Sequence, residues 1–332
     1  MLYSYKNLGR NGRLGNQLFQ IAGTIGRAKG SGNHLSARFP SWEYFEYFNV
    51  PSLYFDDTSE SAFDLGNEYL QDIREFSHCE ELVRDLFRPS SRAIDELQSA
   101  YGHLLAGHRT SVHVRRGDYV RMKQFHPPCS TGYFREAMAK VMETHPETTF
   151  LIFSDDLEWC VDQFESSSQV VFVSAHSSFN KVSQDVVEFN LMQTCDAHII
   201  SNSTFSWWAA YLADSSTVVA PDTWFGPELS HIDTDVLIPE SWVRLPSRSV
   251  GPQHAMELEI SEAEDGLVVL NVVARRVHHL NSTASLLFEL CTGDNTVESI
   301  IQTMAYLSEV LKLPEFDTNE TLQMFFREGL IV

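Results

Sequence analysis

The feature that most constrains the fold of this 332-residue chain is a regular alternation of strand-like and helix-like segments after residue 110. Short runs of apolar, β-branched residues recur, and a helical pattern of apolar residues follows most of them. This alternation is typical of a parallel sheet whose strands are joined by crossover helices, so it predicts an α/β fold. The expected strands are Ser111–Val114, Thr149–Phe153, Val170–Val173, His198–Ile200 and Thr217–Ala220. The expected helices lie near residues 133–145, 156–165, 183–194 and 204–213.

Polar residues follow each expected strand. They are the segments Arg115–Asp118, Ser154–Asp156, Ser174–His176, Ser201–Thr204 and Pro221–Thr223. Because the carboxyl ends of parallel strands meet at one edge of a sheet, we expect these loops to form one composite ligand site.

The first of these loops carries two adjacent arginines. Gly117 allows a sharp turn after the strand, so Arg115, Arg116 and Asp118 should emerge together. Guanidinium groups are planar, permanently charged and able to bind two oxygens at once, which suits a diphosphate. The alternative is a surface ion pair between Arg116 and Asp118 at a strand end. His113 lies on the strand, which favours a structural over a catalytic role; it is also a candidate substrate contact.

The loop Ser154–Asp156 ends a strand and begins a helix. One aspartate can cap that helix, and only one cap is needed. The other carboxylate would be free to accept hydrogen bonds from a ribose hydroxyl or from the N1–H and amino edge of a guanine. We therefore count Ser154, Asp155 and Asp156 among the expected substrate contacts.

The loop Ser201–Thr204 places four small polar residues before an aromatic-rich helix. Hydroxyl groups and the N–H groups of a helix N-terminus can hold a phosphate without any lysine. Capping of a buried helix would explain Ser203 or Thr204 alone, but not the whole run. We expect Asn202, Ser203, Thr204 and Phe205 to contact the phosphates.

A glycine-rich segment lies near the start of the chain. In Gly9–Gly23, three glycines within seven residues precede a helical pattern, which predicts a loop that leads into a helix N-terminus. The polar residues Asn16 and Gln17 beside Gly15 favour a site for an anion or for the polar edge of a sugar. The alternative is an ordinary strand–turn–helix connection.

Two further segments precede the alternating region. Residues 38–62 are irregular and rich in aromatic side chains. Such rings can bind sugar C–H faces, but core packing is the more frequent use of so much ring area. Residues 79–106 show helical periodicity interrupted by Pro89,.

The composition argues against several functions. The net charge of −21 disfavours sequence-independent binding to nucleic acid and docking on an anionic membrane,. Five cysteines without Cys-x-x-Cys spacing indicate neither a disulfide framework nor a zinc site,. No segment has the apolar length of a membrane helix or a signal peptide, so we expect a cytoplasmic protein.

The character of the chain changes after Trp242. Residues 244–252 form a linker rich in proline, glycine and serine, which predicts a domain boundary,. Residues 251–332 contain 13 acidic and 4 basic residues. Strand-like segments at Met256–Ile260 and Gly266–Val273 precede a helix capped by Asn281 or Ser282, and further helices follow. This pattern predicts a small winged-helix-like α+β domain, whose acidity disfavours DNA binding.

Four ordered segments resemble the signature segments of the alpha-1,2-fucosyltransferase family, glycosyltransferase family 11. They are Gly12–Gln20, His113–Tyr119, Phe153–Asp156 with Trp159, and Ser201–Trp208, and the resemblance spans about residues 8–245. It implies a GT-B-like fold, with an N-terminal acceptor-side α/β region over residues 1–108 and a Rossmann-like GDP-sugar domain over residues 109–245. It also implies GDP-β-L-fucose as donor, inversion at the anomeric carbon, no metal or other cofactor, and transfer to the 2-hydroxyl of a galactoside.

The C-terminal region resembles, less strongly, the PqqD-like peptide-binding fold. The matching segments are Leu280–Ala284, Glu289–Gly293, Thr296–Ile300 and Gly329–Ile331. The resemblance implies a PqqD-like domain over residues 253–332 and a possible peptide partner. The aspartate that usually precedes the glycine of the second segment is Thr292 here.

The resemblance and the loop chemistry together suggest roles for individual residues. Arg115 and Arg116 would neutralise the departing diphosphate, with help from the helix that begins near Phe205. Asn16 and Gln17 would face the fucose and the acceptor. Asp118 is the candidate general base, or else it orients one of the two arginines.

Two other functions stay open at this stage. One is GDP-sugar-dependent transfer to a peptide or glycopeptide that the C-terminal domain recruits. The other is a carbohydrate-binding protein without activity, against which the intact arginine pair argues.

Overall fold

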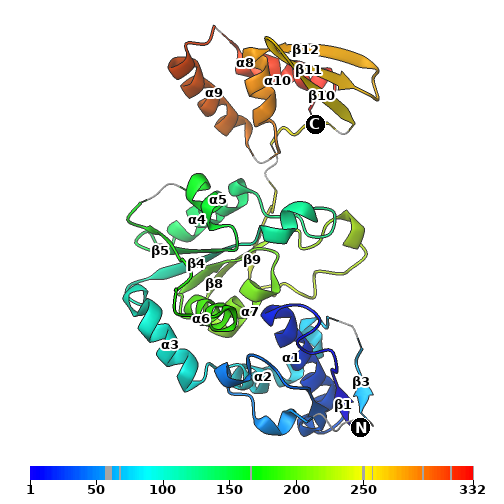
Figure 1. The fold of residues 1–332 in the computed structure, drawn as a ribbon, viewed down its shortest axis with the longest axis vertical. Helices are drawn as coiled ribbons and strands as arrows, with labels where there is room; N and C mark the ends of the chain where they lie inside the picture. Colours follow the sequence, from blue (N-terminus) through cyan, green and yellow to red (C-terminus); the bar gives the residue numbers. More distant parts are fainter. Residues whose placement is uncertain are drawn as a thin grey trace. The chain divides into compact units, whose positions relative to one another are not determined.

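The computed structural model describes residues 1–56, 62–66, 69–164, 167–248, 251–255, 257–293, 295–314 and 316–331. The chain divides into a larger unit, residues 1–129 and 137–245, and a smaller unit, residues 130–136 and 246–332 (Figure 1). All five cysteines are free thiols and buried. Within the described ranges, no helix combines the length and the apolar character needed to cross a membrane.

A six-stranded parallel sheet organises the larger unit, as the alternating pattern predicts. Its strands are β4 (Arg109–Val114), β5 (Thr149–Ser154), β6 (Val170–Phe172), β7 (Ala197–Ile199), β8 (Thr217–Pro221) and β9 (Val243–Leu245). The spatial order is β6-β5-β4-β7-β8-β9, and every neighbouring pair is parallel. Strand β9 was not predicted, because Val243–Leu245 has an arginine at its centre and is largely exposed, so it forms no apolar run. In the register of β4 and β5, Val114 lies opposite Ser154, so the two polar loops leave the sheet side by side.

The helices that follow the strands along the chain are α4 (Thr131–Met142), whose first residues belong to the smaller unit, α5 (Leu157–Gln163), α6 (Lys181–Gln193) and α7 (Thr204–Ala213). Figure 1 shows α6 and α7 on the face of the sheet opposite to α5. Trp207 and Trp208 of α7 are fully buried. A helix that is apolar on all sides belongs in a core, which explains why α7 lies between the sheet and the N-terminal region.

The N-terminal region is also α/β. Strands β1 (Tyr3–Ser4), β2 (Ala37–Arg38) and β3 (Phe63–Asp64) form a short parallel sheet in the order β2-β1-β3. Its helices are α1 (Leu14–Gly30), α2 (Glu80–Leu86) and α3 (Ser91–Tyr101), with Pro89 between the last two as expected. Two parallel α/β regions in one chain agree with the GT-B-like expectation. The domain boundaries at residues 108 and 253 stay predictions.

The aromatic segment after residue 38 packs into the core, as expected. Its buried rings are Phe39, Trp42, Tyr44, Tyr47, Phe48 and Tyr54. The core of the N-terminal region continues into that of the six-stranded sheet, since Phe19 of α1 lies 4.7 Å from Trp207, measured between ring centroids. Residues 57–61 of the expected segment lie outside the described residues.

The smaller unit has its own core. Antiparallel strands β10 (Leu258–Ala263), β11 (Gly266–Asn271) and β12 (Arg276–Asn281) precede α8 (Ser282–Leu290), α9 (Val297–Leu311) and α10 (Thr318–Arg327). Asn281 caps α8 by accepting a hydrogen bond from the Ala284 backbone nitrogen at 2.9 Å. The small α+β unit is confirmed, with residue 256 of the expected first strand outside the described residues.

Candidate active site

Arg115 leaves β4 at the carboxyl edge of the sheet and binds two carboxylates. Its guanidinium forms ion pairs with Asp118 and Asp155 and lies 5.0 Å from the centre of the Tyr119 ring. The side chain is only 12% exposed. The guanidinium is thus fixed at the strand end, where it pairs with both carboxylates.

Arg116 is held by a different set of groups. Its guanidinium stacks 3.8 Å above the centre of the Trp159 ring, and its Nε donates to Asp156 Oδ2 at 3.2 Å. A cation that is stacked and paired in this way keeps its remaining N–H groups in a defined direction. The two arginines therefore emerge together, as the glycine turn predicts.

The two aspartates after β5 accept hydrogen bonds from different backbone segments. Asp156 caps α5 by accepting from the Trp159 backbone nitrogen at 3.4 Å. Since Asp156 is the cap, Asp155 would be the free carboxylate of the prediction, but it accepts from the backbone nitrogens of Arg116 at 2.9 Å and Gly117 at 3.2 Å. Asp155 consequently organises the turn Arg115–Asp118, here called the arginine turn.

The N-termini of α1 and α7 meet beside this turn. A Cβ atom on Gly15 would lie 2.5 Å from the backbone nitrogen of Phe205, so the two backbones are in direct contact. The Thr204 hydroxyl donates to Asn16 Oδ1 at 2.8 Å. The glycine-rich segment and the Ser201–Thr204 loop, predicted separately, are thus brought together.

Neither of these two helix N-termini has a side-chain cap. The residues at the N-cap positions, Arg13 for α1 and Ser203 for α7, make no capping hydrogen bond. Side chains cap α3, α5, α6, α8, α9 and α10, whereas α2 also lacks a side-chain cap. Uncapped N–H groups at two helix N-termini in contact favour an anion at this position.

The remaining residues of the Ser201–Thr204 loop fix the loop itself. The Ser201 hydroxyl donates to the His113 carbonyl oxygen and accepts from the Arg115 backbone nitrogen at 3.0 Å. Asn202 is buried, and its Nδ2 donates to the carbonyl oxygens of Pro127 at 3.0 Å and Trp224 at 2.9 Å. In this structure the Asn202 amide therefore joins three loops.

Gln17 is similarly occupied. Its Nε2 donates to the Gly12 carbonyl oxygen at 3.0 Å, and its Oε1 accepts from Trp42 Nε1 at 2.7 Å. The side chain is buried, and its hydrogen bond to Gly12 stabilises the glycine-rich loop. Sequence reasoning could not foresee this use, because Trp42 is distant in the chain.

His113 is buried beside the two arginines. Burial lowers its pKa to about 4, so the imidazole is neutral near pH 7,. Its Nδ1 finds no hydrogen-bond partner among the described residues, and its ring lies 5.6 Å from that of Phe205. A neutral histidine at this place adds no charge to the site.

Glu188 on α6 is a half-buried carboxylate that sequence reasoning missed. Its Oε1 accepts from Gln184 Nε2 at 2.6 Å, and burial raises its pKa to about 7. The next residue, Phe189, packs edge-on against Phe205 at 5.5 Å. The available signal was an acid within the apolar run from Val186 to Phe189.

No metal centre is evident within the part of the chain that the structure describes. There, no three His, Cys, Asp or Glu side chains are grouped closely enough to hold an ion. The positive charge at the strand ends comes from guanidinium groups and helix N-termini.

Comparison with known proteins gives two family matches. Residues 18–245 match the model of glycosyl transferase family 11, and residues 266–331 match that of the coenzyme PQQ synthesis protein D, PqqD. The first covers more than half of the chain, and the second covers most of the smaller unit.

Curated relatives support the first match. An alpha-1,2-colitosyltransferase of Escherichia coli is 33% identical over 189 residues, which are 53% of this chain and 61% of that protein. A galactoside alpha-(1,2)-fucosyltransferase 1 of Gorilla gorilla gorilla is 29% identical over 241 residues, 63% of this chain and 65% of that protein. The chain thus spans less than two thirds of the length of either relative. The fucosyltransferase NodZ of Bradyrhizobium aligns with a TM-score of 0.42 and 13% identity over 63% of this chain and 93% of its own.

Proposed function

Because the chain belongs to glycosyl transferase family 11, we propose that it moves L-fucose from GDP-β-L-fucose to the 2-hydroxyl of a galactoside, with inversion and without a metal ion. The observation that carries the proposal is the meeting of Arg115, Arg116 and two uncapped helix N-termini at one edge of the sheet. Together these groups supply the positive charge that a leaving diphosphate requires.

The transfer separates charge at the bond between fucose C1 and the diphosphate oxygen. That bond breaks and its electron pair goes to GDP, while the acceptor hydroxyl oxygen bonds C1 from the opposite face. Groups fixed in advance around the diphosphate stabilise the transition state more than the bound substrate. Removal of one such group should lower the rate on the order of 10² to 10³.

The acceptor hydroxyl must also release a proton, and Asp118 is our candidate to receive it. In this structure Asp118 pairs with Arg115. A bound diphosphate would compete for the same guanidinium and release the Asp118 carboxylate. We therefore expect the donor to bind before the acceptor becomes reactive.

Guanine recognition needs a carboxylate that can accept from both N1–H and the 2-amino group. Asp155 and Asp156 were the expected residues, but each is engaged in the arginine turn. Glu188 keeps one oxygen without a hydrogen bond among the described side chains, and α6 packs against the start of α7 through Phe189. We assign Glu188 to the guanine.

The test is release of GDP from GDP-fucose by the full chain, with and without lactose, with the linkage of the product read by NMR. Transfer to the 2-hydroxyl that continues in excess EDTA is the expected result. An absence of turnover with every galactoside would contradict the proposal. GDP-colitose should be included as a second donor, because one relative is a colitosyltransferase.

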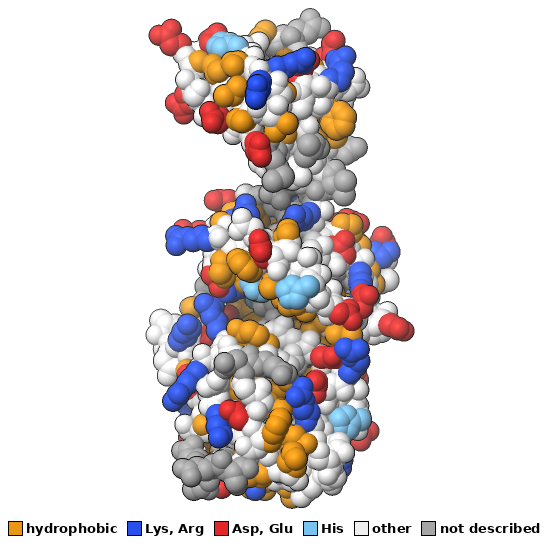
Figure 2. All heavy atoms as spheres, turned by 90° about the vertical axis from the view of Figure 1, so that its right-hand side faces the viewer, with side chains coloured by type: hydrophobic (Ala, Val, Ile, Leu, Met, Phe, Trp, Pro, Cys, Tyr) orange, Lys and Arg blue, Asp and Glu red, His pale blue; other side chains and the backbone are white. Residues whose placement is uncertain are grey.

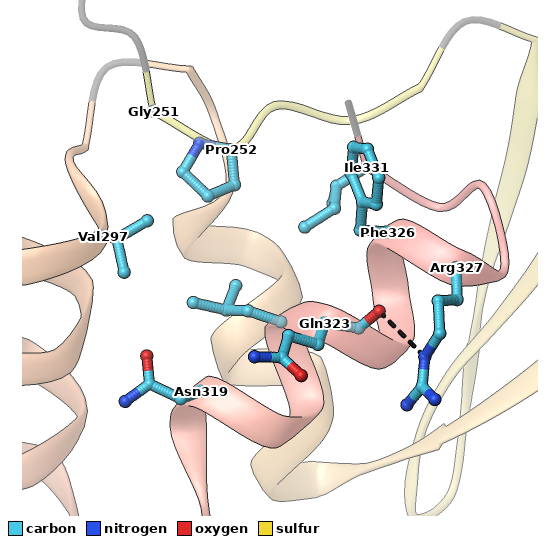
Figure 3. Close-up of a pocket in the computed structure, with 9 residues that line it drawn as sticks. Gly251, Pro252, Val297, Asn319, Gln323, Phe326, Arg327 and Ile331 are labelled. Carbon is cyan, nitrogen blue, oxygen red and sulfur yellow. Dashed lines mark hydrogen bonds between the residues drawn. The ribbon is translucent and has the colours of Figure 1, made fainter.

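A second candidate function is transfer to a peptide or glycopeptide, and features of the smaller unit favour it. Among the described strands β12 pairs with β11 alone, which leaves its other edge for a peptide strand, and Val277 on β12 is 67% exposed,. A cavity of 610 Å³ lies between the linker at Pro252, α9 and α10, with Phe326 and Ile331 in its wall (Figure 3). Turnover with a peptide but with no galactoside would favour this function.

A further inference from the structure

The segment Val120–Phe125, here called the amphiphilic loop, directly follows the arginine turn. Its three apolar side chains, Val120, Met122 and Phe125, are 38%, 37% and 43% exposed. Arg121 and Lys123 between them are exposed, and neither forms an ion pair with any described residue. Single exposed apolar residues are common, but three within six residues beside unpaired cations call for a binding role.

The amphiphilic loop is fixed at both ends. The rings of Tyr119 and His126, which flank it, stack at 4.9 Å. Its C-terminal part is bound to the segment after β8, since Gly226 donates its backbone N–H to the Phe125 carbonyl at 2.8 Å and Glu228 donates to that of Gln124 at 3.0 Å. The exposed side chains are therefore presented on a supported backbone, and folding of the core does not require them there.

The amphiphilic loop also begins at the proposed diphosphate site. The Val120 backbone nitrogen donates to the Arg116 carbonyl at 3.0 Å, and the Arg115 guanidinium lies over the ring of Tyr119. Whatever binds the loop is thus adjacent to the place where the acceptor hydroxyl must reach the sugar.

We propose that the amphiphilic loop binds the aglycone of the acceptor, and that this aglycone is an alkyl chain joined to the sugar through a phosphate. This inference rests on the proposed function and names its acceptor class. Arg121 and Lys123 would bind the phosphate, and Met122 and Phe125 would bind the hydrocarbon. In a chain with a net charge of −21, two cations one residue apart that form no ion pair with a described residue indicate an anionic ligand,.

Two other occupants fit less well. A polar glycan binds through hydrogen-bonding side chains and aromatic rings, and Val120 and Met122 offer neither. An anionic bilayer would be repelled by the chain as a whole, and Figure 2 shows acidic side chains interspersed with cations and hydrophobic groups over the face that it displays,. A single amphiphilic molecule can bind the loop without bringing a large charged surface close.

The experiment compares four β-galactosides with the full chain: a methyl glycoside, an alkyl glycoside, a glycosyl phosphate and an alkyl glycosyl phosphate. KM and kcat are measured with GDP-fucose, and binding of each acceptor is measured separately by calorimetry. We expect the KM for the alkyl phosphate to be at least about tenfold below that for the methyl glycoside.

Two loop variants separate the two parts of the ligand. Met122→Ser/Phe125→Ser should lose the gain from the alkyl chain, and Arg121→Gln/Lys123→Gln should lose the gain from the phosphate. Both variants should keep the kcat for the methyl glycoside. Leu53→Ser/Arg88→Gln is the matched control, because Leu53 is 49% and the Arg88 side chain 72% exposed elsewhere in the larger unit.

Equal KM values for the four acceptors, or loop variants that keep the preference, would overturn the inference. If the parent transfers fucose to none of them, the proposed function fails, and calorimetry still decides the role of the loop. Tight binding of the alkyl phosphate that both loop variants lose would then support it, whereas binding that they retain would refute it.

Discussion

Gly15 and Phe205 are 190 residues apart in the chain, yet no side-chain atom fits between them: a Cβ on Gly15 would lie 2.5 Å from both the Phe205 nitrogen and the Thr204 carbonyl carbon. The contact joins the N-termini of α1 and α7, and it places two sets of uncapped N–H groups beside the arginine turn. The proposed anion site thus depends on the absence of one methyl group.

Gly15→Ala should therefore damage the donor site. The methyl group has to push the two helix N-termini apart, since its nearest neighbours are backbone atoms that cannot rotate away,. We expect the Kd for GDP to rise about tenfold or more, with a loss of folding stability of about 1–3 kcal/mol. Calorimetry with GDP and urea unfolding measure the two effects.

Gly30→Ala is the matched control, because Gly30 lies at the other end of the same helix and its nearest neighbour would be His78 Nε2 at 3.8 Å. It should leave GDP binding unchanged. Equal GDP affinities for Gly15→Ala and Gly30→Ala would show that the helix contact does not form the phosphate site.

The second prediction concerns the planar geometry of Arg116. Arg116→Lys keeps the charge but loses the stack on Trp159 and the fork of N–H groups,. We expect kcat to fall on the order of 10² and the Kd for GDP to rise, because a lysine cannot bind two phosphate oxygens in one plane. Steady-state kinetics and calorimetry with GDP provide the measurement.

Arg244→Lys serves as its control, since Arg244 pairs with Asp235 at 2.8 Å in β9, away from the carboxylates of the arginine turn. A parent-like kcat for Arg116→Lys would mean that charge alone is enough at this position.

The sheet and its polar edge could be predicted because their signals are local. Alternating runs predicted five of the six strands; β9 was missed because Val243–Leu245 contains Arg244, is largely exposed and lies next to a linker. The loops after β4 and β7 were found because arginines and small polar residues at strand ends have a direct chemical meaning. Parallel pairing then brought them together.

Individual side-chain roles could not be predicted, because they depend on residues far apart in the chain. Gln17 accepts a hydrogen bond from Trp42, and Asp155 accepts one from the backbone of Arg116. The periodicity of the sequence does not predict either contact. Glu188 escaped notice because acids are common in helices, and only burial makes this one unusual,. A residue type thus indicates what a site can do, and tertiary contacts decide which residues are free to do it.

The third prediction follows from the raised pKa of Glu188. If the ionised carboxylate accepts from guanine, GDP binding should strengthen as the pH rises toward about 7, the pKa of this group, and then level off,. Below that value the affinity should fall up to about tenfold per pH unit. Glu188→Gln should bind GDP more weakly and with little pH dependence, and Glu80→Gln on α2 should behave like the parent. If GDP affinity depended on pH in the same way in the parent and in Glu188→Gln, Glu188 would have no role in binding guanine.

The fourth prediction concerns folding stability in acid and the buried His198. Its Nδ1 bonds the Ser111 hydroxyl at 2.7 Å and its Nε2 bonds that of Ser215 at 2.9 Å, while burial lowers its pKa to about 3. In the unfolded chain the His198 imidazole is protonated below about pH 6.5, whereas in the folded chain it stays neutral down to about pH 3,. The free energy of unfolding therefore falls as the pH drops from about 6.5 to about 3. One such histidine contributes a slope of about 1.4 kcal/mol per pH unit.

His198→Gln, compared by urea unfolding at several pH values, should be less stable than the parent at neutral pH and should lose stability more slowly on acidification. The exposed His176→Gln should keep the parent slope, and a parent slope in His198→Gln as well would show that His198 is not kept neutral by the fold.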